Sequence, residues 1–168
     1  FVDLMRFLSL QGVLCPLPIA DKAGVSLHLL KGKPALMVTC LNGTDILAPN
    51  IHQVKQVAHA LAHMHIKGLG FAQNGINQRD KTWRINIAQK VLPKLANDDQ
   101  ALLQSELEYL HAKDFSPLPR GVVHGDLFRD NVLFDGEQLG GFIDFYYACN
   151  DALVYDIAIA VNEWCVHH

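Results

Sequence analysis

The sequence predicts an α+β fold, and three patterns along its 168 residues support that prediction. Near the start, residues 25–41 hold two apolar runs separated by a Lys-Gly-Lys turn, which is typical of paired strands. Residues 121–145 hold a second such pair around an Asp-Gly turn. Between them, residues 44–120 carry apolar side chains mainly at helical spacing. Helices and strands that occupy separate stretches of a chain indicate the α+β class.

The first part of the chain is expected to contain one helix and one strand pair. Residues 2–10 have apolar side chains at helical spacing, and Gly12 ends that pattern. The next segment, 15–18, contains two prolines and is expected to be an extended link. Strands are expected at 25–30 and 34–41 because both runs are apolar and the turn between them contains glycine.

The rest of the chain is expected to be mainly helical outside the second hairpin. Helices are predicted at 51–65, 83–95, 98–111 and 152–165. The segment 68–81 is rich in Gly, Asn and Gln and is expected to be a surface loop. His59 and His63 have the spacing of two metal ligands on one helix face. No Glu follows His59 and the helix around the pair is amphipathic, which favours a structural role for both histidines.

The most informative segment is GVVHGDLFRDNVLFDGEQLGGFIDF, residues 121–145. A His-Gly-Asp sequence with Asp126 as its last residue follows an apolar run, and Asn131 comes five positions after Asp126. Asp144 lies near the end of the returning strand, 139–145. Because the two strands form a hairpin, Asn131 and Asp144 are expected to approach each other.

This residue set suits phosphoryl transfer from ATP. An amide oxygen and a carboxylate, here Asn131 and Asp144, are hard oxygen ligands that fit Mg²⁺. Asp126 would then orient the acceptor hydroxyl and take its proton. The alternative is a purely structural role, since a loop Asp is often a turn or capping residue and an Asp-Gly pair is often only a hairpin turn. The order of the three residues on one hairpin favours the catalytic interpretation.

The same residues resemble a known superfamily. HGDLFRDNVLF followed by GGFIDFYYA is similar to the catalytic core of the aminoglycoside phosphotransferase and choline kinase superfamily, which has a protein-kinase-like fold. The insert Phe128-Arg129-Asp130 and the later YDIAIAVNEWC resemble its bacterial homoserine kinase branch. The resemblance implies a small-molecule kinase that uses ATP and Mg²⁺ to phosphorylate the hydroxyl of L-homoserine.

The resemblance also implies a role for individual residues. Asp126 would be the catalytic base, and Asn131 and Asp144 the Mg²⁺ ligands. His124 would be a structural residue of the loop, and Asp156 would support the loop through hydrogen bonds. The main-chain groups of Thr39 and Leu41 would bind the adenine edge at a hinge, although an ordinary strand end explains these two residues about as well.

The acceptor pocket of an amino-acid kinase needs opposite charges, because homoserine carries an ammonium and a carboxylate. Arg129 is a candidate for the carboxylate, and Asp130 or Glu163 for the ammonium. A solvated loop arginine or an ion pair with a neighbouring acid is the alternative for Arg129. Two other functions remain open: a related kinase for another hydroxyl acceptor, such as choline, methylthioribose or an aminoglycoside, and an inactive remnant of the kinase fold. The loop 68–81 is expected to cover part of this acceptor site.

By the same resemblance, residues 1–43 are expected to be the remainder of a nucleotide-binding lobe with its hinge. Residues 44–168 are expected to form a catalytic lobe that is incomplete at its end. No Gly-rich phosphate loop and no upstream phosphate-binding lysine occur in the sequence. The segment alone is therefore expected to be inactive as a kinase.

Composition excludes several other classes. The chain is half hydrophobic with a formal net charge of −3, as is common for globular proteins. Basic residues are scattered, which argues against a nucleic-acid partner. No apolar run is long enough to cross a membrane, and the four cysteines are widely separated, which argues against zinc or a disulfide framework. These features favour a cytoplasmic protein with a small-molecule substrate, and they leave its oligomeric state open.

Overall fold

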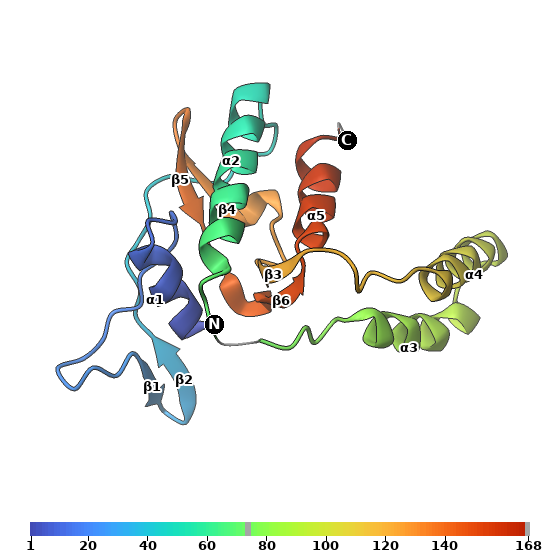
Figure 1. The fold of residues 1–168 in the computed structure, drawn as a ribbon, viewed down its shortest axis with the longest axis horizontal. Coiled ribbons are helices and arrows are strands. Elements are labelled where there is room, and N and C mark those ends of the chain that lie inside the picture. The colour runs from blue at the N-terminus through green and yellow to red at the C-terminus, as the bar shows by residue number, and fades with distance from the viewer. Residues whose placement is uncertain (73–74, 167–168) are drawn as a thin grey trace.

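The computed structural model describes residues 1–72 and 75–166 (Figure 1). Its helices are α1 (Val2–Leu10), α2 (Ile51–Gly68), α3 (Lys81–Val91), α4 (Asn97–Ala112) and α5 (Val154–Trp164). Its strands are β1 (Leu27–Leu30), β2 (Lys33–Leu36), β3 (Arg120–Val123), β4 (Val132–Asp135), β5 (Gln138–Phe142) and β6 (Cys149–Ala152). These strands form three antiparallel pairs, β1 with β2, β3 with β6 and β4 with β5, so the α+β prediction is confirmed.

The first strand pair is shorter than the sequence predicted. Lys31 and Gly32 both have positive φ, as a tight two-residue hairpin turn requires, and they join β1 to β2. The second run was expected to continue beyond Leu36, but it leaves β1 there and pairs with the proline-containing link instead. The Ile19 N–H donates to the Met37 carbonyl at 2.9 Å, so the second run pairs first with β1 and then with the end of the link.

Local capping explains where the central helices begin. Asn50 and Gln53 form a reciprocal capping box at the start of α2, which continues to Gly68, three residues beyond the expected end. The Asp80 side chain accepts from the Trp83 N–H at 2.8 Å and starts α3. The helix expected over 83–95 ends at Val91 and continues as a 3₁₀ turn containing a proline.

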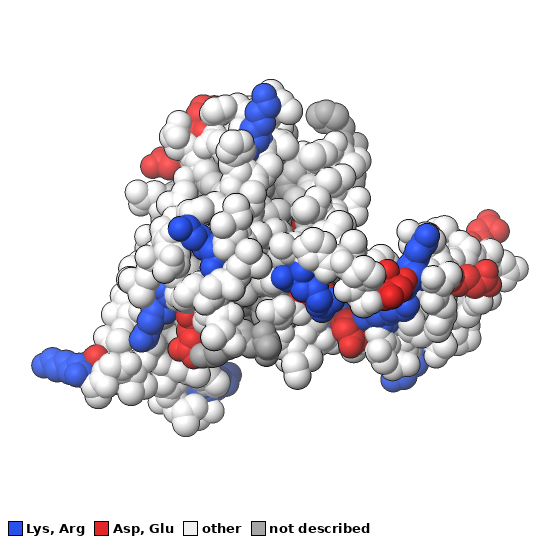
Figure 2. Space-filling model, in the orientation of Figure 1, with Lys and Arg blue, Asp and Glu red and all other residues white. Residues whose placement is uncertain are grey.

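Helices α3 and α4 pack mainly against each other and project from the rest of the molecule (Figure 1). Only Ala88 of α3 and Leu107 of α4 are buried, whereas Trp83 and Leu102 are exposed. On the face shown in Figure 2, acidic and basic side chains are mixed on this projecting pair and scattered elsewhere. Among the described residues, no helix combines the length and the apolar character needed to span a membrane.

The hairpin predicted within residues 121–145 is present, with one change and one addition. β4 and β5 pair from Val132–Phe142 to Asp135–Gln138, but β5 ends at Phe142, so Asp144 lies beyond the strand rather than near its end. Strand β6 was not expected from the sequence. It pairs with β3 along its whole length, which closes the segment after Asp144 onto the strand that enters the catalytic loop.

A single buried cluster joins the beginning of the chain to the hairpin. Leu4 and Leu8 of α1 lie in the same core as Leu61 of α2 and Phe134 and Phe142 of the hairpin. The division into residues 1–43 and 44–168 remains a prediction, because these two parts share this core.

A short backbone bridge holds the end of the first part against β4. The Thr44 N–H donates to the Phe134 carbonyl at 3.0 Å, and the Phe134 N–H returns a bond of 2.8 Å. Gly43 precedes this bridge with φ of 107°, and a Cβ there would lie 2.4 Å from the Phe134 carbonyl group. Only glycine fits such a close approach.

Candidate active site

The catalytic loop between β3 and β4 is held by a buried carboxylate. Asp156, in the first turn of α5, has no exposed surface. Its Oδ2 accepts from the His124 N–H at 2.7 Å, and its Oδ1 accepts from the Gly125 N–H at 2.8 Å. The His65 Nε2, near the end of α2, donates to Oδ2 at 2.9 Å. One side chain therefore fixes the backbone on the N-terminal side of Asp126 and ties it to two helices.

The glycine of the His-Gly-Asp sequence is required by its surroundings. Gly125 has φ of 78°, in the left-handed region. A Cβ at this position would lie 2.8 Å from the Tyr147 carbonyl oxygen. The loop therefore packs directly against the segment that follows Asp144.

The imidazole of His124 links the catalytic loop to the residue before Asp144. Its Nε2 lies 2.9 Å from the Ile143 carbonyl oxygen, which can only accept, so Nε2 carries the proton. The ring packs against Phe145 with centroids 4.6 Å apart, and Nδ1 is buried without a partner. Burial lowers the pKa of His124, because the charged form would lose its hydration. A neutral, deeply buried imidazole of this kind is suited to support the loop.

Asp126 and Asn131 are in direct contact. The Asn131 Nδ2 donates to the Asp126 carbonyl at 2.8 Å and to the Asp126 carboxylate at 3.2 Å. Because the amide nitrogen is used on Asp126, the amide oxygen faces away from it and is available as a ligand. Asn131 is buried, whereas Asp126 is partly exposed and can reach a bound molecule.

A backbone hydrogen bond brings the segment that contains Asp144 next to Asn131. The N–H of Ile143 donates to the Asn131 carbonyl at 2.9 Å, which brings the residue before Asp144 beside Asn131. Asp144 has φ of 61° and ψ of 64°, a left-handed conformation that few residues other than glycine adopt, and its side chain is exposed. An exposed carboxylate and an available amide oxygen on adjoining segments are a donor set that fits Mg²⁺.

The charged residues expected in the acceptor pocket are arranged differently from the prediction. The Arg129 Nε donates to Glu163 Oε1 at 2.9 Å, and its guanidinium also donates to the Leu47 carbonyl. Arg129 and Glu163 thus neutralise each other, so neither offers an unpaired charge to a carboxylate or an ammonium in this structure. Their pairing corresponds to the structural alternative for Arg129, although with Glu163 instead of a neighbouring Asp. Asp130 is exposed, and its role stays a prediction.

The two residues predicted to contact adenine lie at and just beyond the end of the segment that pairs with residues 17–19. The Thr39 N–H donates to the Leu17 carbonyl at 3.0 Å, and the Thr39 hydroxyl accepts from the Leu17 N–H at 2.9 Å. The N–H of Thr39 is therefore used within the chain. The adenine-binding roles of the main-chain groups of Thr39 and Leu41 stay predictions.

Three site residues were not singled out as functional from the sequence. The His65 Nε2 donates to the Asp156 carboxylate from α2. The Trp164 Nε1 donates to the Leu127 carbonyl at 3.1 Å and holds the loop on the C-terminal side of Asp126. Tyr147 packs against Gly125. Each contact joins segments more than 20 residues apart, and no local pattern in the sequence marks such pairs.

The fold is similar to that of solved kinases and aminoglycoside phosphotransferases. Amicoumacin kinase hAmiN superposes with a TM-score of 0.69 at 17% identity, covering 94% of this chain and 50% of that one. Wild-type aminoglycoside 2'-phosphotransferase-IIIa gives 0.67 at 18% identity, covering 96% and 61%. Likeness at this level of identity concerns the fold alone.

The sequence places the chain in a particular family. The model of the phosphotransferase enzyme family, APH, matches residues 1–167, so the chain belongs to that family. The family resemblance inferred from the catalytic segment is thereby confirmed.

Curated homoserine kinases are similar to nearly the whole chain. The one from Methylobacillus flagellatus is 49% identical over 167 residues, which is 99% of this chain and 52% of that protein. The one from Neisseria meningitidis serogroup B is 44% identical over 164 residues, which is 98% of this chain and 54% of that protein. The chain spans about half the length of the curated relatives it matches.

Proposed function

We propose that the protein containing this chain transfers the γ-phosphate of ATP to the side-chain hydroxyl of L-homoserine. The observation that carries this proposal is the contact between Asp126 and Asn131 on a loop held by Asp156, in a chain up to 49% identical to homoserine kinases. The matched region covers nearly the whole chain and therefore includes the segment that carries Asp126, Asn131 and Asp144. One solved neighbour contains AMP-PNP, an ATP analogue, which supports ATP as the phosphate donor.

In the proposed reaction, Asp126 orients the acceptor hydroxyl and accepts its proton as the bond to phosphorus forms. Its partial exposure gives the hydroxyl access, and the amide of Asn131 holds the carboxylate in place. Asn131 and Asp144 are the residues that would hold Mg²⁺, which supplies charge neutralisation at the transferring phosphate. The backbone between these groups is fixed by Asp156, His124 and Trp164, so little reorganisation is needed when the substrates bind.

The test is an acceptor panel with the complete protein and Mg-ATP, comparing L-homoserine with choline, methylthioribose and an aminoglycoside. We expect L-homoserine to have the highest kcat/KM. Asp126→Asn should lower kcat by roughly 10²- to 10⁴-fold, the usual contribution of a general base, while the affinity for ATP stays unchanged. Preference for another acceptor would overturn the assignment of homoserine, and normal turnover by Asp126→Asn would overturn the role of the base.

A further inference from the structure

The loop between α2 and α3 lies against the segment that follows Asp144. The Asn150 N–H donates to the Gly75 carbonyl at 2.8 Å, and the Asn77 amide donates to the Asp151 carboxylate. The same segment touches the catalytic loop, since Tyr147 packs against Gly125, the residue before Asp126. The described part of this loop, from Gly75 onward, is therefore connected to the loop that carries Asp126 through the segment that contains Tyr147.

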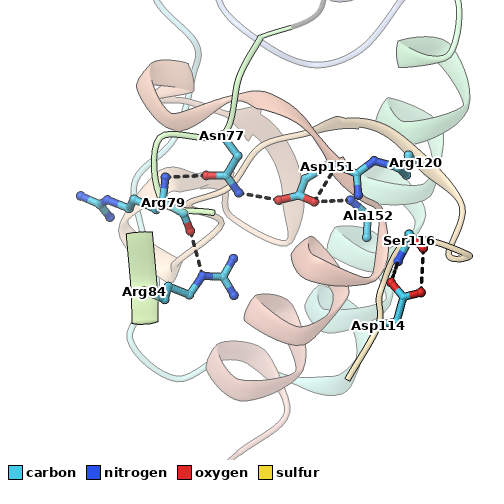
Figure 3. Close-up of polar contacts among 8 residues, drawn as sticks. All are labelled: Asn77, Arg79, Arg84, Asp114, Ser116, Arg120, Asp151 and Ala152. Atoms are coloured by element: carbon cyan, nitrogen blue, oxygen red, sulfur yellow. Dashed lines mark hydrogen bonds and ion pairs between the residues drawn. The ribbon is translucent and has the colours of Figure 1, made fainter. Parts of the chain in front are cut away.

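The backbone of Arg79 in this loop is held by its neighbours (Figure 3). Its N–H donates to the Asn77 side chain at 2.8 Å, and its carbonyl accepts from the Arg84 Nε at 2.8 Å. Asn77 is held in turn by Asp151, which also pairs with Arg120 at 3.1 Å. Because three side chains fix this turn, the position of Arg79 does not depend on a bound ligand.

The guanidinium of Arg79 extends away from that network (Figure 3), and its central carbon lies over an aromatic ring. Its Cζ is 3.8 Å from the centre of the Tyr147 ring, and one of its nitrogens donates to the Tyr147 hydroxyl at 2.5 Å. Arg79 is exposed, and within 1–72 and 75–166 no acidic side chain forms an ion pair with it. A guanidinium has five N–H donors, so most of those on Arg79 are available to a ligand in the plane of the group.

The other arginines near the site already use their side chains on groups within the chain. Arg129 is neutralised by Glu163 at 2.9 Å, and Arg120 by Asp151 at 3.1 Å. Arg84 stacks on the Tyr155 ring and uses its Nε on a backbone carbonyl. Among these, Arg79 combines exposure, contact with an aromatic ring and the lack of an acidic partner, which are the properties of a carboxylate receptor.

We propose that Arg79, held against Tyr147, binds the carboxylate of the acceptor and so selects an amino-acid alcohol over uncharged or cationic alcohols. This inference rests on the proposed function, and it assigns to Arg79 the role that the sequence suggested for Arg129. An unpaired positive charge at this position repels polycationic acceptors and attracts a carboxylate. The proposal places the hydroxyl at the other end of the same molecule at Asp126.

The test compares L-homoserine with L-homoserinamide, which keeps the hydroxyl and the amine but lacks the negative charge. The complete wild-type protein is expected to prefer L-homoserine strongly. Arg79→Ala should raise the KM for L-homoserine by about 10- to 100-fold, the loss expected for one charge-assisted pair, with little change for the amide or for ATP. Arg79→Lys keeps the charge without the bidentate geometry, so its KM for L-homoserine should lie between those of wild type and Arg79→Ala. Lys90→Ala, which removes one exposed charge from α3, is the matched control and should behave as wild type.

The outcomes separate this inference from the proposed function. If Arg79→Ala and Arg79→Lys both keep the wild-type preference for L-homoserine over its amide, the role of Arg79 is wrong and the proposed function stands. If the wild-type protein phosphorylates neither compound, the proposed function fails and the inference fails with it. A collapse of the preference in Arg79→Ala, without a change in the KM for ATP, supports both.

Discussion

Replacement of Asp156 by alanine is expected to lower the free energy of unfolding by about 3–5 kcal/mol. The carboxylate is fully buried and accepts from the His124 N–H, the Gly125 N–H and the His65 side chain, all within 2.9 Å. Alanine leaves these three donors without an acceptor, and each buried donor left unsatisfied costs about 1–3 kcal/mol. For three donors the loss is about 3–9 kcal/mol, and a water molecule that enters the space can satisfy part of it, which brings the expected loss to about 3–5 kcal/mol.

The assay is urea unfolding of the complete protein, with amide hydrogen exchange at Gly125 as a local readout. Asp156→Asn keeps one acceptor oxygen and should lie between wild type and alanine in stability. Glu106→Gln, an exposed position on α4, is the control and should change stability by less than about 0.5 kcal/mol. If Asp156→Ala unfolds within about 1 kcal/mol of wild type and its Gly125 amide exchanges no faster, the claim that this carboxylate holds the catalytic loop is wrong.

Three further predictions concern the groups around Asp126. Asp144→Asn should raise the Mg²⁺ concentration for half-maximal activity by about tenfold or more, and an unchanged Mg²⁺ titration would remove Asp144 from the metal site. His124 has a lowered pKa in the folded protein and an ordinary value of 6.5, so its stabilising contribution is present above pH 6.5 and is lost as the pH falls through the folded pKa. Between pH 7.5 and 5.5, wild type should therefore lose more stability than His124→Gln, and equal losses in urea unfolding would show that the imidazole is not buried in its neutral form. A double-mutant cycle of Arg129→Ala and Glu163→Gln should give a coupling energy of about 1 kcal/mol, and additive effects would mean that the half-buried pair does not form.

The sequence predicted the type of nearly every element, because each one has a strong local pattern. The helical spacing of residues 51–65, 83–95 and 98–111 corresponds to three helices of the structure, with ends that shift by at most four residues. The ends shifted where local contacts decide, at the capping residue Asp80 and at the proline after α3. Strand β6 was missed because CNDA has no alternating apolar pattern, and it is a strand only because β3 lies beside it.

In the candidate site, too, contacts within one short segment could be predicted from the sequence, whereas contacts between distant segments could not. Asp126 and Asn131 are five residues apart on one loop, so their contact follows from local spacing. Arg129 and Glu163 were both assigned to substrate, and their mutual ion pair could not be read from a sequence in which they are 34 residues apart. Arg79 attracted no attention in a polar loop, because its significance depends on the ring of Tyr147 beneath it, 68 residues further along the chain.

The sequence by itself determined the chemical groups of this protein: a hairpin with an acid, an amide and a second acid in an order typical of phosphotransferases. It could do so because these groups lie within one short segment, where covalent spacing limits their geometry. Only the tertiary structure decided which charges are neutralised and which remain available to a ligand. Hydrogen bonds and ion pairs between distant segments depend on how helices and strands pack together, and that packing brings Asp156, His65, Tyr147 and Arg79 around the loop.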